Sequence, residues 1–180
     1  MNTKSIARNG IIAALYIVFT IINPFSYGNI QFRISEILVL LVFFRKDYML
    51  GLIVGCIIAN FFSPLGWIDV VFGTLATVIA LVAVMNSKRL YIAAVFPLVV
   101  NGLVIGFELY LVEKLPFILS AVQVALGELV VMIVGVIIFT ILKREKDFLK
   151  LIDANQNIWL KVNVSVFIET FCLHYSFSII

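Results

Sequence analysis

Long apolar runs alternate along the chain with short groups of charged or polar residues. The runs show no strand-like alternation of apolar and polar positions, so they predict helices surrounded by lipid rather than a β-barrel. Six helices are predicted, at residues 6–22, 30–44, 48–62, 67–85, 90–112 and 115–142. The second and third are shorter than the roughly 20 residues that cross a bilayer unaided. The cluster Arg45-Lys46-Asp47 between them predicts a tight aqueous turn, so both are kept as spans.

The basic residues in the connections predict how the bundle is oriented. One set of connections carries Lys4, Arg8, Arg45, Lys46, Lys88, Arg89, Lys143, Arg144, Lys146 and Lys150. The other set carries only Arg33 and Lys114. Cytoplasmic connections of membrane proteins are enriched in Lys and Arg. The pattern therefore predicts that both ends of the six-helix bundle are cytoplasmic and that connections 23–29, 63–66 and 113–114 face outward.

The composition agrees with this membrane interpretation. Hydrophobic residues make up 63% of the 180 residues and charged residues 13%, and the mean hydropathy is +1.17. Soluble domains are about half apolar and about one quarter charged, so a soluble globular protein is excluded. We predict one transmembrane domain at residues 1–150. The more polar segment 151–180, whose residues 162–168 alternate like a strand, is predicted to be a tail and receives no role.

Polar side chains inside the predicted spans are the candidate functional residues, because ionisable and amide groups are costly in a membrane. The candidates for substrate binding are Gln31, Arg33, Glu36, Asn60, Asp69, Asn101, Glu108, Gln123 and Glu128, with Trp67 as a possible stacking partner for a flat ring. With the orientation above, most of them belong to the outer half of the bundle. They outline a pocket that is reached from outside.

Each candidate also has a structural interpretation. Arg33 and Glu36 are three residues apart and could neutralise each other. Asp69 follows Pro64-Leu65-Gly66 and could cap the next helix, which is the interpretation we favour. The asparagines could tie helices together. Glu108 and Glu128 are harder to explain structurally, since no second basic residue within the spans can pair with them.

The predicted spans hold four acids and only one base. Either some of these carboxyl groups are protonated because they are desolvated, or a cationic or donor-rich ligand satisfies them. This excess of acids is the main indication of the ligand that the residues alone provide.

Small residues on the first predicted helix favour close approach of another helix. Ala7, Gly10 and Ala14 share one face, and Ala13 adjoins them. Because this face lies near the cytoplasmic end, we predict that a partner docks there. The pairs Gly51/Gly55 and Gly102/Gly106 have similar spacing, and for them we favour internal packing.

The chain lacks the motifs of several enzyme classes. It has no Gly-x-x-x-x-Gly-Lys-Ser/Thr phosphate loop and no nucleophile elbow or His-Glu-x-x-His pattern. Its two cysteines, Cys56 and Cys172, are too few and too widely separated for a disulfide framework or a metal cluster. We therefore expect no catalytic residues, no metal and no cofactor.

Two stretches resemble a known family. Residues 23–36 read NPFSYGNIQFRISE and residues 60–74 read NFFSPLGWIDVVFGT. Both are similar to signature segments of the substrate-binding S components of energy-coupling factor (ECF) transporters, specifically the queuosine-precursor (QueT) group. The resemblance covers roughly residues 6–150 and does not extend over the tail.

The resemblance implies a multi-pass protein of the bacterial cell membrane with the six-helix S-component bundle. It implies capture of a queuosine precursor, either a deazaguanine base or queuine. It also implies two cytoplasmic ATPases and a membrane-embedded coupling (T) subunit as partners, with the face at Gly10 and Ala14 as a contact. ATP hydrolysis would take place on the partner chains.

The edge of a deazaguanine offers a ring N–H and an amino group that a carboxylate can accept, and a carbonyl that needs a donor. Glu108 or Glu128 would supply the acceptor, and a nearby amide or Arg33 the donor. An aminomethyl cation on the base would use another acid. The alternatives are a proton-coupled secondary carrier for a purine-like or vitamin substrate, an S component for a different vitamin, and a membrane enzyme or scaffold subunit without a small ligand.

Overall fold

The computed structural model describes residues 3–27 and 31–152, and within these ranges the ordered elements are all helical. The helices are α1 (Thr3–Ile22), η1 (Pro24–Tyr27), η2 (Ile34–Leu40), α2 (Leu41–Phe44), η3 (Lys46–Tyr48), α3 (Met49–Asn60), α4 (Trp67–Asn86), α5 (Leu90–Val112), α6 (Phe117–Leu142) and α7 (Lys146–Leu151). Each predicted range thus contains a helix. The predicted tail, including its strand-like alternation, lies outside the described residues apart from residues 151 and 152.

In the described part of the chain, four helices, α1, α4, α5 and α6, are long and apolar enough to cross a membrane. Large apolar side chains cover their outer faces, such as Ile11, Val71, Ile118 and Ile141, each more than 60% exposed. Such a surface is unfavourable in water and suits hydrocarbon. The expectation of an apolar helical bundle is therefore confirmed for these four helices, whereas residues 34–44 form a shorter apolar helix.

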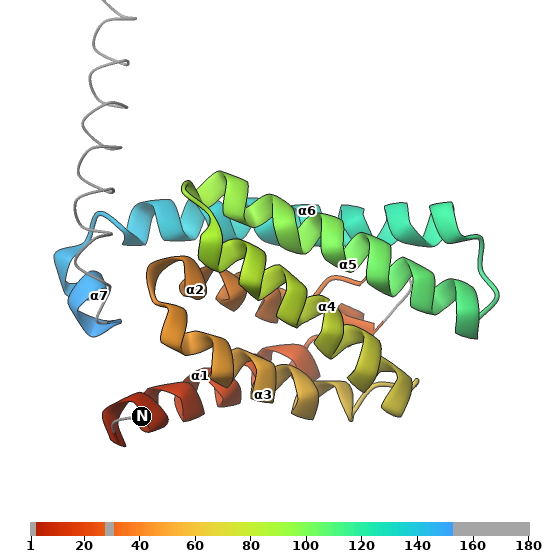
Figure 1. Ribbon diagram of the computed structural model, residues 1–180, viewed down its shortest axis with the longest axis horizontal. Coiled ribbons are helices and arrows are strands. Elements are labelled where there is room, and N and C mark those ends of the chain that lie inside the picture. The colour runs from red at the N-terminus through yellow and green to blue at the C-terminus, as the bar shows by residue number, and fades with distance from the viewer. Residues whose placement is uncertain (1–2, 28–30, 153–180) are drawn as a thin grey trace, which may run out of the picture.

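The two ends of the bundle differ in their connections (Figure 1). The beginning of α1, the turn between α2 and α3, the turn between α4 and α5, and α7 gather at the left end in this view. These segments carry Lys4, Arg45, Lys46, Lys88, Arg89, Lys146 and Lys150, so we call this end the basic end. The connections 61–66 and 113–116 lie at the opposite end.

The segment formed by η2 and α2 lies in the centre of the bundle, where it contacts α1, α3, α4, α5 and α6. Its side chains Val39, Leu40, Val42 and Phe44 have no exposed surface. The segment is apolar apart from Ser35 and Glu36, and part of its surface stays open, since Ile34 is 40% exposed. Contact with five helices also explains how a short 3₁₀ segment is tolerated, because irregular backbone in an apolar bundle is stable where protein packs around it.

Glycines allow the helices to approach closely. A Cβ on Gly51 would lie 2.5 Å from the backbone oxygen of Asn9, and one on Gly55 would lie 3.0 Å from that of Ala13. These contacts seat α3 on α1. In addition, the backbone N–H of Gly51 in the first turn of α3 donates to Asn9 Oδ1 at 2.7 Å. The first N–H groups of a helix have no acceptor within the helix itself, and α1 supplies one for Gly51.

A second glycine pair joins α5 to α6. A Cβ on Gly106 would lie 2.7 Å from the Cα of Ala121, and one on Gly102 would lie 3.1 Å from the Cβ of Ala125. Internal packing, the interpretation favoured for both glycine pairs, is therefore confirmed.

Candidate functional site

Buried polar side chains from six segments form one connected cluster inside the bundle. We define the polar cluster as Tyr16, Arg33, Glu36, Asn60, Asp69, Asn101, Glu108 and Glu128, all at most 7% exposed. They come from α1, the start of η2, and helices α3, α4, α5 and α6 where these face the centre. Seven of the eight were predicted from their position in apolar runs, and only Tyr16 was not.

Glu36 lies at the centre of the cluster. The Tyr16 hydroxyl donates to Glu36 Oε1 at 2.5 Å, which joins α1 to η2. The Asn101 side chain of α5 lies within interaction range of both Glu36 and Glu128 of α6. One turn beyond Tyr16, the hydroxyls of Thr20 and Ser35 are 2.7 Å apart and tie the same two segments together. The first helix therefore contributes a side chain to the polar cluster and also holds η2 in position.

Arg33 is the one cation of the polar cluster, and the loop before η2 holds it in place. Its Nε donates to the backbone oxygen of Ser26 at 3.0 Å, and its guanidinium lies 5.8 Å from the centre of the Tyr27 ring. The Tyr27 hydroxyl in turn donates to the backbone oxygen of Ala59 at 2.6 Å. Burial raises the pKa of Tyr27, so the hydroxyl stays protonated and remains a donor. Ser26 and Tyr27 thus hold the Arg33 side chain near the C-terminal end of α3.

Asn60 occupies the contact between α3 and α4. Its Nδ2 donates to Cys56 Sγ at 3.3 Å, and Cys56 Sγ lies 3.2 Å from Thr77 Oγ1. A Cβ on Gly73 would lie 2.5 Å from Asn60 Nδ2, so only glycine leaves room for the amide here. Among the described residues, the hydrogen bond of the Asn60 side chain stays within α3, so Asn60 contacts α4 by packing against Gly73 rather than by the predicted hydrogen bond between helices.

Asp69 lies in the first turn of α4, and its carboxylate accepts a hydrogen bond from Ser63 Oγ. The N-cap residue of α4 is Gly66, with φ +56° and ψ −120°, and no side chain caps the helix. Among the described residues the capping hydrogen bond that we favoured for Asp69 is therefore absent, but its carboxylate does lie in the first turn of α4, where a negative charge suits the helix dipole. Its neighbour is instead Glu108 of α5, which lies within direct interaction range.

Within residues 3–27 and 31–152, several atoms of the polar cluster are buried without a hydrogen-bond partner. They are Arg33 Nη2, Glu36 Oε2, Asn60 Oδ1, Asp69 Oδ1, both carboxyl oxygens of Glu108, and Glu128 Oε1. Buried polar atoms in proteins are almost always bonded, and leaving one unbonded costs about 1–3 kcal/mol. Six of these atoms are acceptors and one is a donor. The arrangement therefore suits a ligand that carries several N–H groups and at least one acceptor.

The remaining predicted residues have different positions. Gln31 is 6% exposed and precedes Arg33 in the loop, and Gln123 is half-buried on α6. Trp67 is 71% exposed and packs edge-on against Phe61, with ring centres 4.6 Å apart. The structure thus places Trp67 on the surface rather than beside the polar cluster. Its position suits a membrane–water interface.

The predicted partner face on α1 is partly used within the chain. Ala7, Gly10 and Ala14 are exposed, and a Cβ on Gly10 would meet nothing within 4 Å. Ala13, in contrast, is 8% exposed and packs against Gly55. Three of the four small residues therefore lie on the outer surface.

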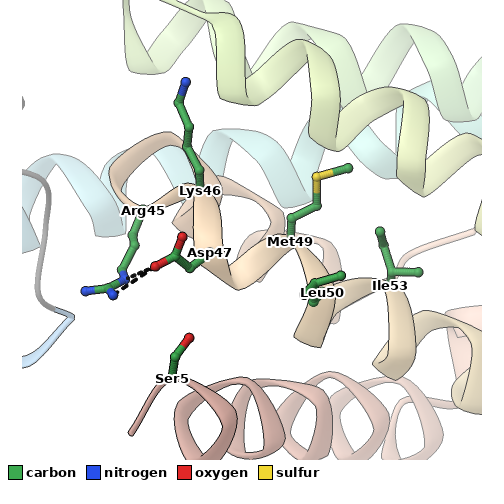
Figure 2. A pocket seen from close by; sticks show the side chains of 7 residues that line it. All are labelled: Ser5, Arg45, Lys46, Asp47, Met49, Leu50 and Ile53. Atoms are coloured by element: carbon green, nitrogen blue, oxygen red, sulfur yellow. Dashed lines mark hydrogen bonds and ion pairs between the residues drawn. The ribbon is translucent and has the colours of Figure 1, made fainter. Parts of the chain in front are cut away.

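A separate groove of about 520 Å³ lies at the basic end, between α1 and the turn that joins α2 to α3 (Figure 2). It is lined by Ser5, Arg45, Lys46, Asp47, Met49, Leu50 and Ile53. Arg45 and Asp47 form an ion pair of 2.9 Å beside it. None of these residues belongs to the polar cluster. In the described part of the chain, no group of three or more His, Cys, Asp or Glu side chains is arranged to hold a metal ion.

Comparison with known proteins agrees with this organisation. A family profile described as QueT transporter matches residues 6–144. The Queuosine precursor transporter QueT of Lactococcus lactis subsp. cremoris (strain MG1363) is 33% identical over 164 residues, which cover 81% of this chain and 96% of the relative. No solved structure gives a significant match. The matched region contains every residue of the polar cluster, and the chain belongs to the QueT transporter family.

Proposed function

We propose that this chain is the substrate-binding membrane subunit, or S component, of an ATP-driven ECF importer, and that it captures a queuosine precursor from outside the cell. The observation that carries the proposal is the polar cluster, with six unpartnered acceptors and one unpartnered donor inside an apolar bundle. The name of the Lactococcus relative indicates the substrate class. A deazaguanine base has N–H groups for the acids and a carbonyl for Arg33 or an amide.

The proposed topology has six membrane segments and both termini in the cytoplasm of a bacterium. The four long helices support four of the segments. The central segment at residues 34–44 and helix α3 supply the other two, shielded from lipid on most sides by their neighbours. The gathering of basic residues at one end supports a cytoplasmic basic end. The end of the bundle with connections 61–66 and 113–116 would then face the exterior, and Asn60, Asp69 and Glu108 of the polar cluster lie near these connections in the sequence.

The proposed partners are a membrane-embedded coupling (T) subunit and two cytoplasmic ATPases. The sequence contains no phosphate loop, so another chain would supply ATP hydrolysis. The exposed face at Ala7, Gly10 and Ala14 has no side chain large enough to hinder a partner helix. It lies near the basic end, which in this topology faces the ATPases.

Ligand binding by the purified full-length chain in detergent tests the capture role. We expect saturable binding of a deazaguanine base or queuine, and none of riboflavin or thiamine. Glu128→Gln should weaken this binding about tenfold or more, because a neutral amide accepts hydrogen bonds less strongly than a carboxylate. Glu145→Gln is the matched control, since Glu145 is exposed at the basic end. Binding of a different vitamin alone would reject the substrate, and no binding of any small molecule would reject the capture role.

Transport measurements separate the ECF mechanism from a proton-coupled carrier. Vesicles that contain the purified chain alone and a proton gradient should not accumulate the base. Vesicles that also contain the coupling subunit and both ATPases should accumulate it when ATP is supplied. Accumulation by the chain alone would support the carrier instead.

A further inference from the structure

The groove at the basic end lies between two helices that Asn9 joins. The side chain of Asn9 donates from Nδ2 to the backbone oxygen of Ser5 at 2.9 Å, and its Oδ1 accepts the backbone N–H of Gly51 at 2.7 Å. Ser5 lines the groove on the α1 side, and Met49 and Leu50 line it on the α3 side. The packing of α1 against α3 therefore fixes the spacing of the two walls.

Positive charge predominates at this groove. Arg45 and Lys46 line it, and Asp47 is the one acid among the described residues that do so. Asp47 accepts from Arg45 Nε at 3.2 Å and from Nη2 at 2.9 Å, which positions the guanidinium beside the groove (Figure 2). On the first helix, Lys4 and Arg8 lie within one turn of the groove wall. Four basic side chains thus lie in or next to the groove against one acid, so it attracts an anion.

An apolar strip leads from the groove along α3. Leu50 lines the groove, and Val54 and Ile58 follow at intervals of four residues, so the three side chains share one face of the helix. They are 53%, 48% and 39% exposed. At 1.5 Å per residue, the strip is about 12 Å long. A free anion such as phosphate would leave this strip uncovered, whereas the acyl chain of a lipid would cover it.

We propose that the groove binds the headgroup of an anionic phospholipid, with the phosphate beside Arg45 and one acyl chain along the strip on α3. Basic pockets between membrane helices on the cytoplasmic side bind such headgroups, and the topology proposed above places the basic end there. The groove residues do not belong to the polar cluster. The lipid is therefore a second ligand at a separate site, and failure of this inference would leave the capture role intact.

The first test compares two lipids with the same acyl chains on the purified full-length chain. Native mass spectrometry in a neutral detergent measures how much phosphatidylglycerol or phosphatidylcholine the chain retains. We expect phosphatidylglycerol to bind about tenfold more tightly, because only its headgroup brings a net negative charge to the basic residues. Equal affinities would overturn the inference. Displacement of the lipid by inorganic phosphate at the same concentration would also overturn it, since the site would then be one for a free anion.

The second test assigns the lipid to the groove. Arg45→Gln should lower the affinity for phosphatidylglycerol about fivefold, and Leu50→Gln should lower the affinity for both lipids because the strip loses its first apolar side chain. Arg89→Gln and Leu75→Gln are the matched controls, since Arg89 is exposed at the same end and Leu75 is 50% exposed on α4. Unchanged binding in the groove variants, or equal losses in the controls, would overturn the assignment. If Arg45→Gln fails to fold, Leu50→Gln and its control still decide it.

Discussion

Tyr16 is the residue through which the first helix enters the polar cluster, and its hydroxyl donates to one of the two carboxyl oxygens of Glu36, Oε1. Tyr16→Phe removes this hydroxyl and leaves the ring in place, so Glu36 Oε1 loses its partner in the interior. We expect a loss of stability of about 1–3 kcal/mol, as for other buried groups that lose a charged hydrogen bond. The thermal unfolding midpoint of the purified chain in detergent measures this effect.

Tyr110→Phe is the control for that substitution, because Tyr110 is 48% exposed on α5. Tyr110→Phe also removes a hydroxyl group, but from the surface, so the thermal unfolding midpoint of this variant should stay close to that of the unmodified chain. If the two substitutions had equal effects, the Tyr16–Glu36 hydrogen bond would not contribute to stability.

Single residues also show what could be predicted from the sequence. Charged and amide residues stand out in apolar runs, so the acids, Arg33, Asn60 and Asn101 were identified as candidates. Tyr16 and Cys56 resemble ordinary helix residues, and their roles depend on contacts with segments 20 and 21 residues away. For Asp69 the sequence position favoured a helix cap. Its actual role depends on the Ser63 hydroxyl and on the backbone of Gly66, which sequence patterns do not reveal.

The packing of α3 against α1 is a property of whole helices, and Gly51 sets its distance. In Gly51→Ala the added Cβ would lie 2.5 Å from the backbone oxygen of Asn9. Because backbone cannot rotate away as a side chain can, the two helices must separate. We expect a destabilisation of about 1–3 kcal/mol, which is typical of overpacking, and a lower thermal unfolding midpoint.

Gly10→Ala makes the same chemical change on an open helix face. Nothing lies within 4 Å of its added Cβ, and alanine is the better helix former by about 0.5–1 kcal/mol. Its midpoint should be unchanged or higher. A destabilisation equal to that of Gly51→Ala would show that the effect does not arise from contact between α1 and α3.

Helix positions followed well from the apolar pattern, since each predicted range contains a helix. The pattern could not show that residues 34–44 lie in the centre of the bundle. A segment that is mostly apolar, as this one is apart from Ser35 and Glu36, is equally compatible with lipid and with a protein interior. The 3₁₀ geometry of η2 depends on the helices around it and was likewise not predicted.

The proposed orientation concerns the whole molecule, and cysteine labelling in intact cells tests it. With Cys172 replaced by serine, Cys56 remains but has no exposed surface. A cysteine at exposed Glu113 should react with a membrane-impermeant maleimide in intact cells, whereas one at exposed Lys88 should react only after the cells are opened. The reverse pattern would place the basic end outside and contradict the proposed direction of capture.

The burial of residues 34–44 also has a consequence for how this chain is made. A cell's insertion machinery selects segments that are long and apolar enough to enter lipid on their own, and this segment is short and follows Arg33 directly. In the proposed topology it would therefore enter the bilayer together with the neighbouring helices that it contacts, above all α1, which brings Tyr16 to Glu36. Biogenesis and assembly of the polar cluster then become a single event. Every chain that completes insertion would arrive with its site already built.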